Sequence, residues 1–223
     1  MELPNNTYIR EHAMTSSHAI TLHGTHLSGH VHRVELLLHM LGLPFTFAEA
    51  GAEVRAGAAF RALNPLGQIP VLQDGELTLS DSNAILVYLC KRYAPGSSWL
   101  PEDATGAAAV QRWLSIAAGE LRYGPASARA TAQWKAAGDP ARSAAIAHGL
   151  LAFMDTYLTE RTFLAAGHAT IADLACYGYI AHAPEGGVSL AGYPALQAWL
   201  KRIEALPAFV PMPPSPLPSS LLP

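Results

Sequence analysis

Charged residues and cysteine are both scarce in this chain. Of its 223 residues only 14% are charged, and the formal net charge is −3. This balance argues against a protein that binds nucleic acid, because such proteins present basic patches to the phosphate backbone. The two cysteines, Cys90 and Cys176, lie in apolar helical patterns and form no CxxC motif. We therefore expect two buried thiols without a disulfide, and a cytoplasmic location in which thiols stay reduced.

Long hydrophobic segments are also missing. The longest unbroken apolar run, 84–90, is too short to span a bilayer, so no membrane partner is expected. Residues 1–18 mix charged and polar side chains without an apolar segment, which predicts a disordered extension rather than a secretory signal. The chain does contain 50% apolar residues, enough to bury a sizeable core in one large or two small domains.

Residues 19–94 alternate between strand and helix patterns. Asp74-Gly75 predicts a tight turn between two strands. The resulting order β-α-β-α-β-β-α matches a thioredoxin-like α/β domain. The expected strands are 19–24, 44–49, 69–73 and 76–79, and the expected helices are 30–41, 54–63 and 82–93.

Beyond a linker at 94–98, every periodic segment is helical, which predicts an all-α domain over 101–210. Thr170-Ile171-Ala172-Asp173 precedes an apolar run and has the pattern of a capping box at a helix start. The segment 211–223 contains six prolines, which predicts a flexible or polyproline tail. The expected helices are 105–123, one or two within 126–158 that break near Gly138-Asp139-Pro140, and 194–206.

Two segments of the α/β domain indicate a ligand site. In Gln68-Ile69-Pro70-Val71 a proline stands at the start of a strand, where it cannot donate to the ladder, and a cis Ile69-Pro70 bond would explain it. Such a bend turns the backbone N–H and C=O of Ile69 away from the sheet. Asp81-Ser82 opens a helix, and the free N–H groups of a helix N-terminus suit a carboxylate. Together these segments predict a site for a small peptide with charged ends.

These elements resemble the glutathione-binding half of the cytosolic glutathione transferase family, and the resemblance extends over residues 19 to about 210. It implies a thioredoxin-like N-terminal domain followed by an all-α C-terminal domain. It also implies that glutathione is a co-substrate, with no separate cofactor.

The resemblance assigns a role to each residue of the two segments. The backbone of Ile69 pairs with the cysteinyl part of glutathione, and Pro70 holds the bend. Asp81 and Ser82 bind the γ-glutamyl end, and Gln68 reaches the glycyl carboxylate. Members of the family more often carry Glu where Asp81 stands, so the carboxylate here is on a shorter side chain.

Thiol activation is expected in the loop that follows the first strand. The thiolate of glutathione is the nucleophile, and a hydroxyl at a helix N-terminus can stabilise it. Ser28 occupies that position, and in serine-type, bacterial-like members of the family this loop carries the activating hydroxyl. Thr25 and His26 are alternatives in the same loop. No tyrosine ends the first strand, which argues against a tyrosine-type enzyme.

The electrophile is expected between this loop and the helical domain. An apolar pocket suits an apolar electrophile, although each candidate residue can equally be part of the core. Arg122 and Arg129 are interpreted as solvated helix charges that could attract an anionic substrate, and Arg33 as a helix residue that pairs locally. The candidate pocket residues are Leu27, Trp113, Leu121 and Tyr123.

The histidines near the first helix do not predict a metal site. His30 and His32 stand two positions apart, so they do not face each other on a helix, and no cysteine completes a ligand set. We therefore expect no bound metal.

The sequence thus predicts an enzyme that conjugates glutathione thiolate to a small apolar electrophile. A glutathione-dependent reductase, isomerase or dehalogenase remains an alternative, as does a glutathione-binding interaction protein without catalysis. A homodimer is also expected. The helix at 82–93 is apolar around most of its circumference, and the alanines of the next helix allow another helix to approach closely.

Overall fold

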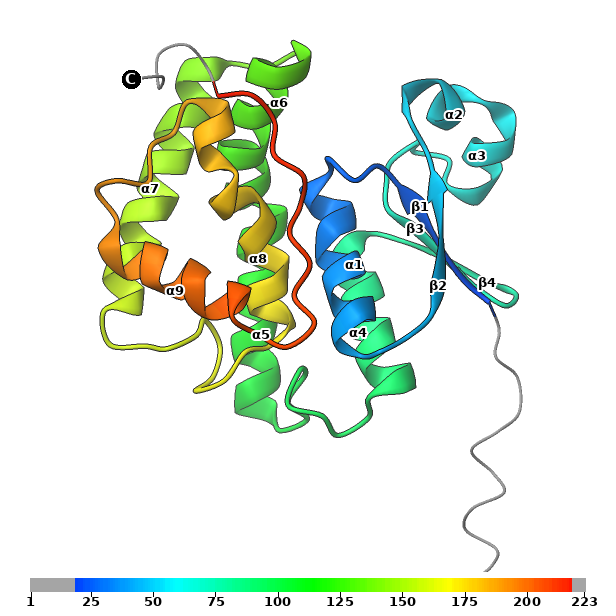
Figure 1. Cartoon of the computed structure of the whole chain (residues 1–223), viewed down its shortest axis with the longest axis horizontal. Coiled ribbons are helices and arrows are strands. Elements are labelled where there is room, and N and C mark those ends of the chain that lie inside the picture. Colours follow the sequence, from blue (N-terminus) through cyan, green and yellow to red (C-terminus); the bar gives the residue numbers. More distant parts are fainter. Residues whose placement is uncertain (1–18, 218–223) are drawn as a thin grey trace, which may run out of the picture.

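A computed structural model describes residues 19–217, and the predicted extension at 1–18 lies outside the described residues. The described chain forms two parts that lie side by side (Figure 1), an α/β part and a helical part. This arrangement confirms the predicted fold class. Among residues 19–217, no helix is both long and apolar enough to cross a membrane.

The α/β part is built on a four-stranded mixed sheet in the order β2-β1-β3-β4. β1 runs parallel to β2 and antiparallel to β3, which pairs in turn with β4. Helices α1 and α4 lie between the sheet and the helical part (Figure 1). The elements are β1 Ile20–Gly24, α1 Gly29–Met40, β2 Phe45–Glu49, α2 Ala52–Ala56, α3 Ala58–Leu63, β3 Val71–Asp74, β4 Leu77–Ser80 and α4 Ser82–Tyr93.

Two details differ from the prediction. The expected helix at 54–63 is divided into α2 and α3, because Gly57 is extended (φ −71°, ψ 153°) and ends one helix while starting the next. The hairpin turn falls at Gly75-Glu76 rather than at Asp74-Gly75. Asp74 remains in the sheet because it pairs with Ile20 and Leu77, and its carboxylate also accepts hydrogen bonds from two tyrosine hydroxyls of α4.

The helical part contains five α-helices and two short irregular helices within the described residues. The predicted helix at 105–123 is too long, because α5 ends at Ala118 and Gly119 adopts φ −99°, ψ −101°. The predicted break near Gly138-Asp139-Pro140 is confirmed. The elements are α5 Ala104–Ala118, the π-helical turn η1 Arg122–Ala126, α6 Ser127–Trp134, α7 Pro140–Leu158, α8 Ile171–Ala181, the 3-10 helix η2 Ala183–Gly186 and α9 Pro194–Glu204.

Helix α8 is the centre of this part, and residues 171–180 are all buried. The predicted capping box is present: the Thr170 side chain accepts a bond from the N-terminal turn, and the Asp173 carboxylate accepts one from the Thr170 N–H. Asp173 also accepts bonds from the Leu164 N–H and the Trp199 indole N–H. Burial nevertheless raises the pKa of Asp173, and these donors offset part of the cost of burying its charge.

The two parts meet where α1 crosses α8. A Cβ added at Gly178 would stand 3.4 Å from the Cα of Gly29, and one added at Gly29 would stand 2.9 Å from the Tyr179 ring. The first distance is an ordinary van der Waals contact, whereas the second is too short for a side chain at position 29 unless the Tyr179 ring moves. The contact fixes the N-terminus of α1 against the helical part.

The described part of the proline-rich segment, predicted as a flexible or polyproline tail, packs against the protein. It runs between α8 and α1 (Figure 1), and Met212 is 3% exposed. Nε2 of His32 in α1 lies 2.8 Å from the Val210 carbonyl, and the Ser215 N–H donates to Glu185. Proline-rich backbone needs few internal hydrogen bonds, so it can pack along two helices without secondary structure of its own.

The buried contact between His32 and Val210 predicts a pH-dependent stability. Burial lowers the pKa of His32 from 6.5 to about 4, so the ring is neutral and donates from Nε2. Between these values the unfolded chain binds a proton that the folded chain does not, and stability is lost as pH falls from about 7 to about 4. We expect His32 to account for about 3 kcal/mol of this loss.

The His32→Gln variant tests this expectation, since an amide can still donate to Val210 but does not titrate. Urea unfolding at a series of pH values should show a shallower loss of stability in acid for the variant than for the original chain. Parallel pH profiles for the two proteins would contradict the assignment.

Candidate functional site

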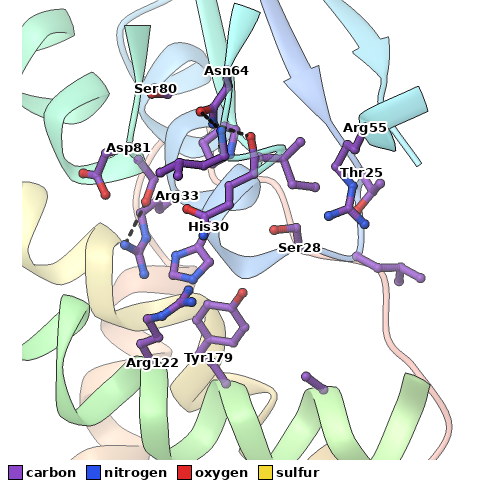
Figure 2. Close-up of a pocket in the computed structure, with 18 of the residues that line it drawn as sticks. Thr25, Ser28, His30, Arg33, Arg55, Asn64, Ser80, Asp81, Arg122 and Tyr179 are labelled. Carbon is purple, nitrogen blue, oxygen red and sulfur yellow. Dashed lines mark hydrogen bonds between the residues drawn. The ribbon is translucent and has the colours of Figure 1, made fainter. Parts of the chain in front are cut away.

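A cavity of about 980 Å³ opens between the α/β part and the helical part. It is lined by the loop after β1, the segment before β3, the N-termini of α1 and α4, and residues of α5, η1, α6 and α8 (Figure 2). All the residues predicted to bind glutathione line it, as do Ser28 and its two alternatives, Thr25 and His26. The cavity therefore brings together the peptide site and the activating loop that the sequence predicts.

The segment before β3 presents free backbone groups to the cavity. The Ile69-Pro70 bond is cis, as predicted, and the sheet ladder begins only at Val71, which pairs with His23. Within residues 19–217, the N–H and C=O of Ile69 take no hydrogen-bond partner. They are available to an extended peptide, in the manner of a strand added to a sheet edge.

Asn64 holds this segment in shape, a role that the sequence analysis missed. Its side chain is buried, donates to the Gln68 carbonyl at 2.9 Å and accepts from the Leu66 N–H at 3.1 Å. The side chain thus ties both ends of the turn that precedes Ile69. An asparagine followed directly by proline is a turn signal that could have indicated this role.

The N-terminus of α4 forms the second part of the site. Asp81 caps the helix, and its Oδ1 accepts from the N–H groups of Asn83 and Ala84 at 2.9 and 3.0 Å. Within the described chain, Oδ2 has no partner. Asp81 also has a φ of 74°, a strained value for a residue other than glycine, and such strain is often found at ligand sites. Ser82 is buried, and its Oγ accepts from Arg33.

Ser28 is the N-cap of α1. Its Oγ accepts from the Val31 N–H at 3.4 Å, which leaves the hydroxyl hydrogen free to donate. Figure 2 shows Ser28 at the edge of the cavity. Of the alternatives, His26 stacks on Phe47 with ring centroids 3.9 Å apart and has Nδ1 at 3.6 Å from Glu35. These contacts engage one face and one nitrogen of His26, whereas the Ser28 hydroxyl keeps its donor.

Of the residues predicted for the electrophile pocket, only Leu27 lines the cavity. Trp113 is 1% exposed and packs against Phe153 and Tyr157 in the core, and the buried Leu121 is likewise absent from the cavity wall. Tyr123 is 60% exposed and lies outside the lining residues. Trp113 faces the core from within α5, and Tyr123 stands one position beyond Arg122 of the cavity wall, so its side chain points in another direction.

The helical wall is instead formed by residues that recur every four positions, so they share one helix face. The sequence analysis missed this stripe because it ended the helix at residue 123. The spacing itself is a visible signal. The wall comprises Ala118, Arg122, Ala126, Ala130 and Trp134, with Tyr179 from α8 beside them.

Positive charge dominates the cavity. Arg33, Arg55 and Arg122 line it, against the carboxylates of Glu49 and Asp81. The pKa of His30 is lowered well below its usual value by burial, and further by Arg33 and Arg122, so this imidazole is neutral at neutral pH. Such a cavity suits an anionic ligand. The described part of the chain holds no group of three or more residues suited to bind a metal ion.

Arg129 is not the solvated helix charge that the sequence analysis expected. It is 1% exposed, and its Nε lies 2.5 Å from Oε2 of Glu185 in η2. Its Nη1 donates to the Leu27 carbonyl at 2.6 Å, and its Nη2 donates to Ser215. Arg129 therefore joins the loop before Ser28 to the helical part and to the C-terminal segment.

Comparison with known proteins supports the family resemblance that the fold and the cavity indicate. The family model described as Glutathione S-transferase, N-terminal domain, matches residues 22–98, and the model described as Glutathione S-transferase, C-terminal domain, matches residues 128–207. The chain is 29% identical to glutathione S-transferase theta-1 from Mus musculus over 77% of this chain and 82% of that protein. Theta-class relatives from Bos taurus and Homo sapiens are matched over 65% of their length.

Solved structures extend this similarity to three dimensions. A glutathione S-transferase from Pseudomonas fluorescens superposes with a TM-score of 0.80 at 31% identity, over 86% of this chain and 98% of that one. A glutathione transferase homologue from Drosophila mojavensis, solved with bound glutathione, gives a TM-score of 0.78 at 26% identity, over 85% and 89% of the two chains. Fold, cavity and relatives agree, and the chain belongs to the glutathione S-transferase family.

Proposed function

We propose that this protein is a serine-type glutathione transferase that conjugates glutathione thiolate to small electrophiles. One observation carries the proposal: a single cavity brings together the free backbone of Ile69, the capped N-terminus of α4 and the donor hydroxyl of Ser28. The first two match the main chain and the charged end of a γ-linked tripeptide. The third lies at a helix N-terminus, where a thiolate is favoured.

In this mechanism the protein binds the peptide and stabilises the anion. Ile69 aligns the cysteinyl residue, Asp81 and Ser82 hold the γ-glutamyl end, and Gln68 reaches the glycyl carboxylate. The Ser28 hydroxyl donates to the sulfur and lowers the pKa of the thiol, so more of it is thiolate at neutral pH. The thiolate attacks the electrophile, a C–S bond forms, and a leaving group departs or a proton is taken up.

The electrophile is expected against the stripe on η1 and α6. Its alanines leave room for a small apolar group, and Trp134, at 50% exposed, offers an aromatic face at the end of the stripe. Reduction, isomerisation and dehalogenation use the same activated thiol, so they stay alternatives. A cytoplasmic location and a role in detoxification are part of the proposal. The free, buried Cys90 and Cys176 fit a reducing compartment.

Retention on immobilised glutathione, followed by a panel of electrophiles, tests the proposal. The panel contains an aryl halide, an epoxide, an alkyl halide and an organic hydroperoxide, with products identified by mass spectrometry. A glutathione conjugate supports the proposed activity, and oxidised glutathione without a conjugate supports a reductase. Retention without turnover would favour an interaction protein, and no retention would overturn glutathione binding.

Asp81→Asn should weaken glutathione binding without slowing the chemical step. Asparagine keeps the helix cap and tolerates a positive φ, but it loses the charge expected to hold the γ-glutamyl ammonium. A contact made equally in the ground and transition states changes KM and not kcat. We expect KM for glutathione to rise about tenfold or more, as for the loss of a charged hydrogen bond. Steady-state kinetics at varied glutathione will check this, and a fall in kcat at constant KM would contradict it.

A homodimer remains a proposal. Within one chain α4 already buries Ile85, Leu86 and Leu89, whereas Ala84 of α4 and Ala108 of α5 are exposed. A second helix can approach closely only where side chains are this small. Light scattering at micromolar concentration is expected to give twice the chain mass of 23.7 kDa. A single-chain mass would rule the dimer out.

A further inference from the structure

His30 is a histidine of the cavity wall that has no hydrogen-bond partner among the described residues. It stands in the first turn of α1, two positions after Ser28, and it lines the cavity. Its ring packs edge-on against Tyr179 of α8, with ring centroids 4.9 Å apart and an interplanar angle of 70°. Within residues 19–217, this contact holds the ring while both of its nitrogens stay unpaired and open to the cavity.

Two arginines help to keep this imidazole neutral. Arg33 of α1 and Arg122 of η1 both lower the pKa of His30, in addition to the larger effect of burial. Figure 2 shows the ring of His30 between these two side chains and close to Tyr179. A neutral imidazole carries one N–H donor, and it is a poor base when its pKa lies well below neutral. The charges around His30 therefore favour a hydrogen-bond donor over a proton acceptor.

His30 lies between the two expected reactants. The sulfur of glutathione is expected at Ser28, and the electrophile is expected against the stripe on η1 and α6. His30 follows Ser28 by less than one helical turn, while its ring reaches Tyr179 on the helical side of the cavity. A donor at this place is near the thiolate and also faces the electrophile that the thiolate attacks.

We propose that the N–H of His30 donates a hydrogen bond to an oxygen of the electrophile, and that the protein conjugates α,β-unsaturated carbonyl compounds and epoxides. The inference rests on the proposed function and adds to it a catalytic residue and a class of substrate. In both kinds of compound, negative charge develops on an oxygen close to the attacked carbon. A neutral imidazole in a cavity can stabilise such an oxygen.

The same donor serves both reactions. With an unsaturated carbonyl compound, the thiolate forms a C–S bond at the β-carbon, and the electron pair of the C=C bond moves toward the carbonyl oxygen. The resulting enolate takes a proton from water. With an epoxide, the C–S bond forms as the C–O bond breaks, and the alkoxide takes a proton from water. His30 stabilises the oxygen in each case and keeps its own proton. An alkyl chloride has no oxygen for His30 to stabilise.

Three phenyl compounds test the role of His30: 4-phenyl-3-buten-2-one, styrene oxide and benzyl chloride. Each is measured at saturating glutathione with the unmodified protein and with His30→Phe, which keeps a ring against Tyr179 but has no N–H. We expect kcat for the two oxygen compounds to fall about 100-fold, the usual cost of one donor to an oxyanion, and kcat for benzyl chloride to fall far less. His30→Gln restores an N–H and should recover part of the loss. His168→Phe, at an exposed position outside the cavity lining, is the matched control and should behave as the unmodified protein does.

Several results would overturn the inference. An equal loss with all three compounds would place His30 at the sulfur or in the fold, and a raised KM for glutathione at constant kcat would assign it to the peptide. Activity of the unmodified protein on benzyl chloride alone would contradict the substrate class.

A measurement on the unmodified protein decides the matter even if no variant folds. Its rate is compared with the uncatalysed reaction of glutathione thiolate with the same compound. Stabilisation of the thiolate alone accelerates all three reactions to a similar degree, whereas the donor should make the acceleration at least about tenfold larger for the oxygen compounds. Equal accelerations would overturn the inference. Failure to form a conjugate with any of the three compounds would overturn the proposed function itself.

Discussion

Replacing Ser28 by alanine is expected to raise the pKa of the thiol of bound glutathione by about one to two units. A hydrogen bond to a charged group contributes about 1.5–3 kcal/mol, and one pKa unit corresponds to 1.36 kcal/mol. The hydroxyl is positioned for this role because it caps α1 and keeps its own hydrogen free. Titration of thiolate absorbance in the complex measures the shift, and the rate of conjugation at neutral pH should fall about 10- to 100-fold with it.

Loss of the helix cap must be separated from loss of the donor. Ser28→Ala removes both, and the cap alone is worth about 1 kcal/mol of stability. Ser28→Gly lacks the hydroxyl but costs only a few tenths of a kcal/mol as a cap. Equal thiol pKa values in the two variants would therefore assign the shift to the hydroxyl. If Thr25→Ala moves the pKa and Ser28→Ala does not, the activating role belongs to Thr25.

Local signals allowed much of the site to be predicted. The cis bond at Ile69-Pro70 follows from a proline that cannot join a ladder, and the cap at Asp81 follows from a short polar side chain at a helix start. Ser28 could be placed at the N-terminus of α1 for the same reason. Each of these features is decided within a few residues of sequence, where steric limits and capping leave few alternatives.

What the sequence did not predict depends on contacts between distant segments. Trp113 and Tyr123 were expected at the electrophile site, but Trp113 packs on Phe153 and Tyr157 of α7, and Tyr123 is exposed outside the cavity. Arg129 was interpreted as a solvated helix charge and Arg33 as a helix residue that pairs locally. Their burial depends on elements about 50 residues or more away, with which they form their hydrogen bonds. Periodicity does not report which partner a charged residue meets, so these roles needed the three-dimensional structure.

Breaking the buried ion pair between Arg129 and Glu185 should have the largest effect on stability. Arg129 is 1% exposed and Glu185 is 4% exposed, so removal of either partner leaves the other charge buried without the arginine–carboxylate pair. Such losses cost about 3–5 kcal/mol. We expect Arg129→Met to lower the free energy of unfolding by this amount, measured by urea denaturation. Arg142→Met, which replaces an exposed arginine of α7, is the matched control and should change stability by less than about 0.5 kcal/mol.

At acid pH the ion pair between Arg129 and Glu185 should stabilise the protein less. Burial acts to raise the pKa of Glu185, but hydrogen bonds from the Ser215 N–H, His182 and Arg129 outweigh it and hold the pKa below the usual 4.5. A carboxylate whose pKa is depressed on folding stabilises the protein above its unfolded pKa, and this stabilisation is lost as pH falls through the folded pKa. The difference in stability between the unmodified protein and Glu185→Gln should therefore be full at neutral pH and shrink in acid below about pH 4.5.

Loss of Arg129 should also affect catalysis, because its Nη1 holds the Leu27 carbonyl next to Ser28. A small displacement of a reacting group can cost up to about 100-fold in rate. At a temperature where Arg129→Met is fully folded, we expect kcat to fall about tenfold or more and the pKa of the bound thiol to rise toward that of the Ser28→Ala complex. A purely structural role would lower stability and leave both values unchanged. That result would confine Arg129 to joining the two parts of the fold, and Ser28 would then be positioned by α1 alone.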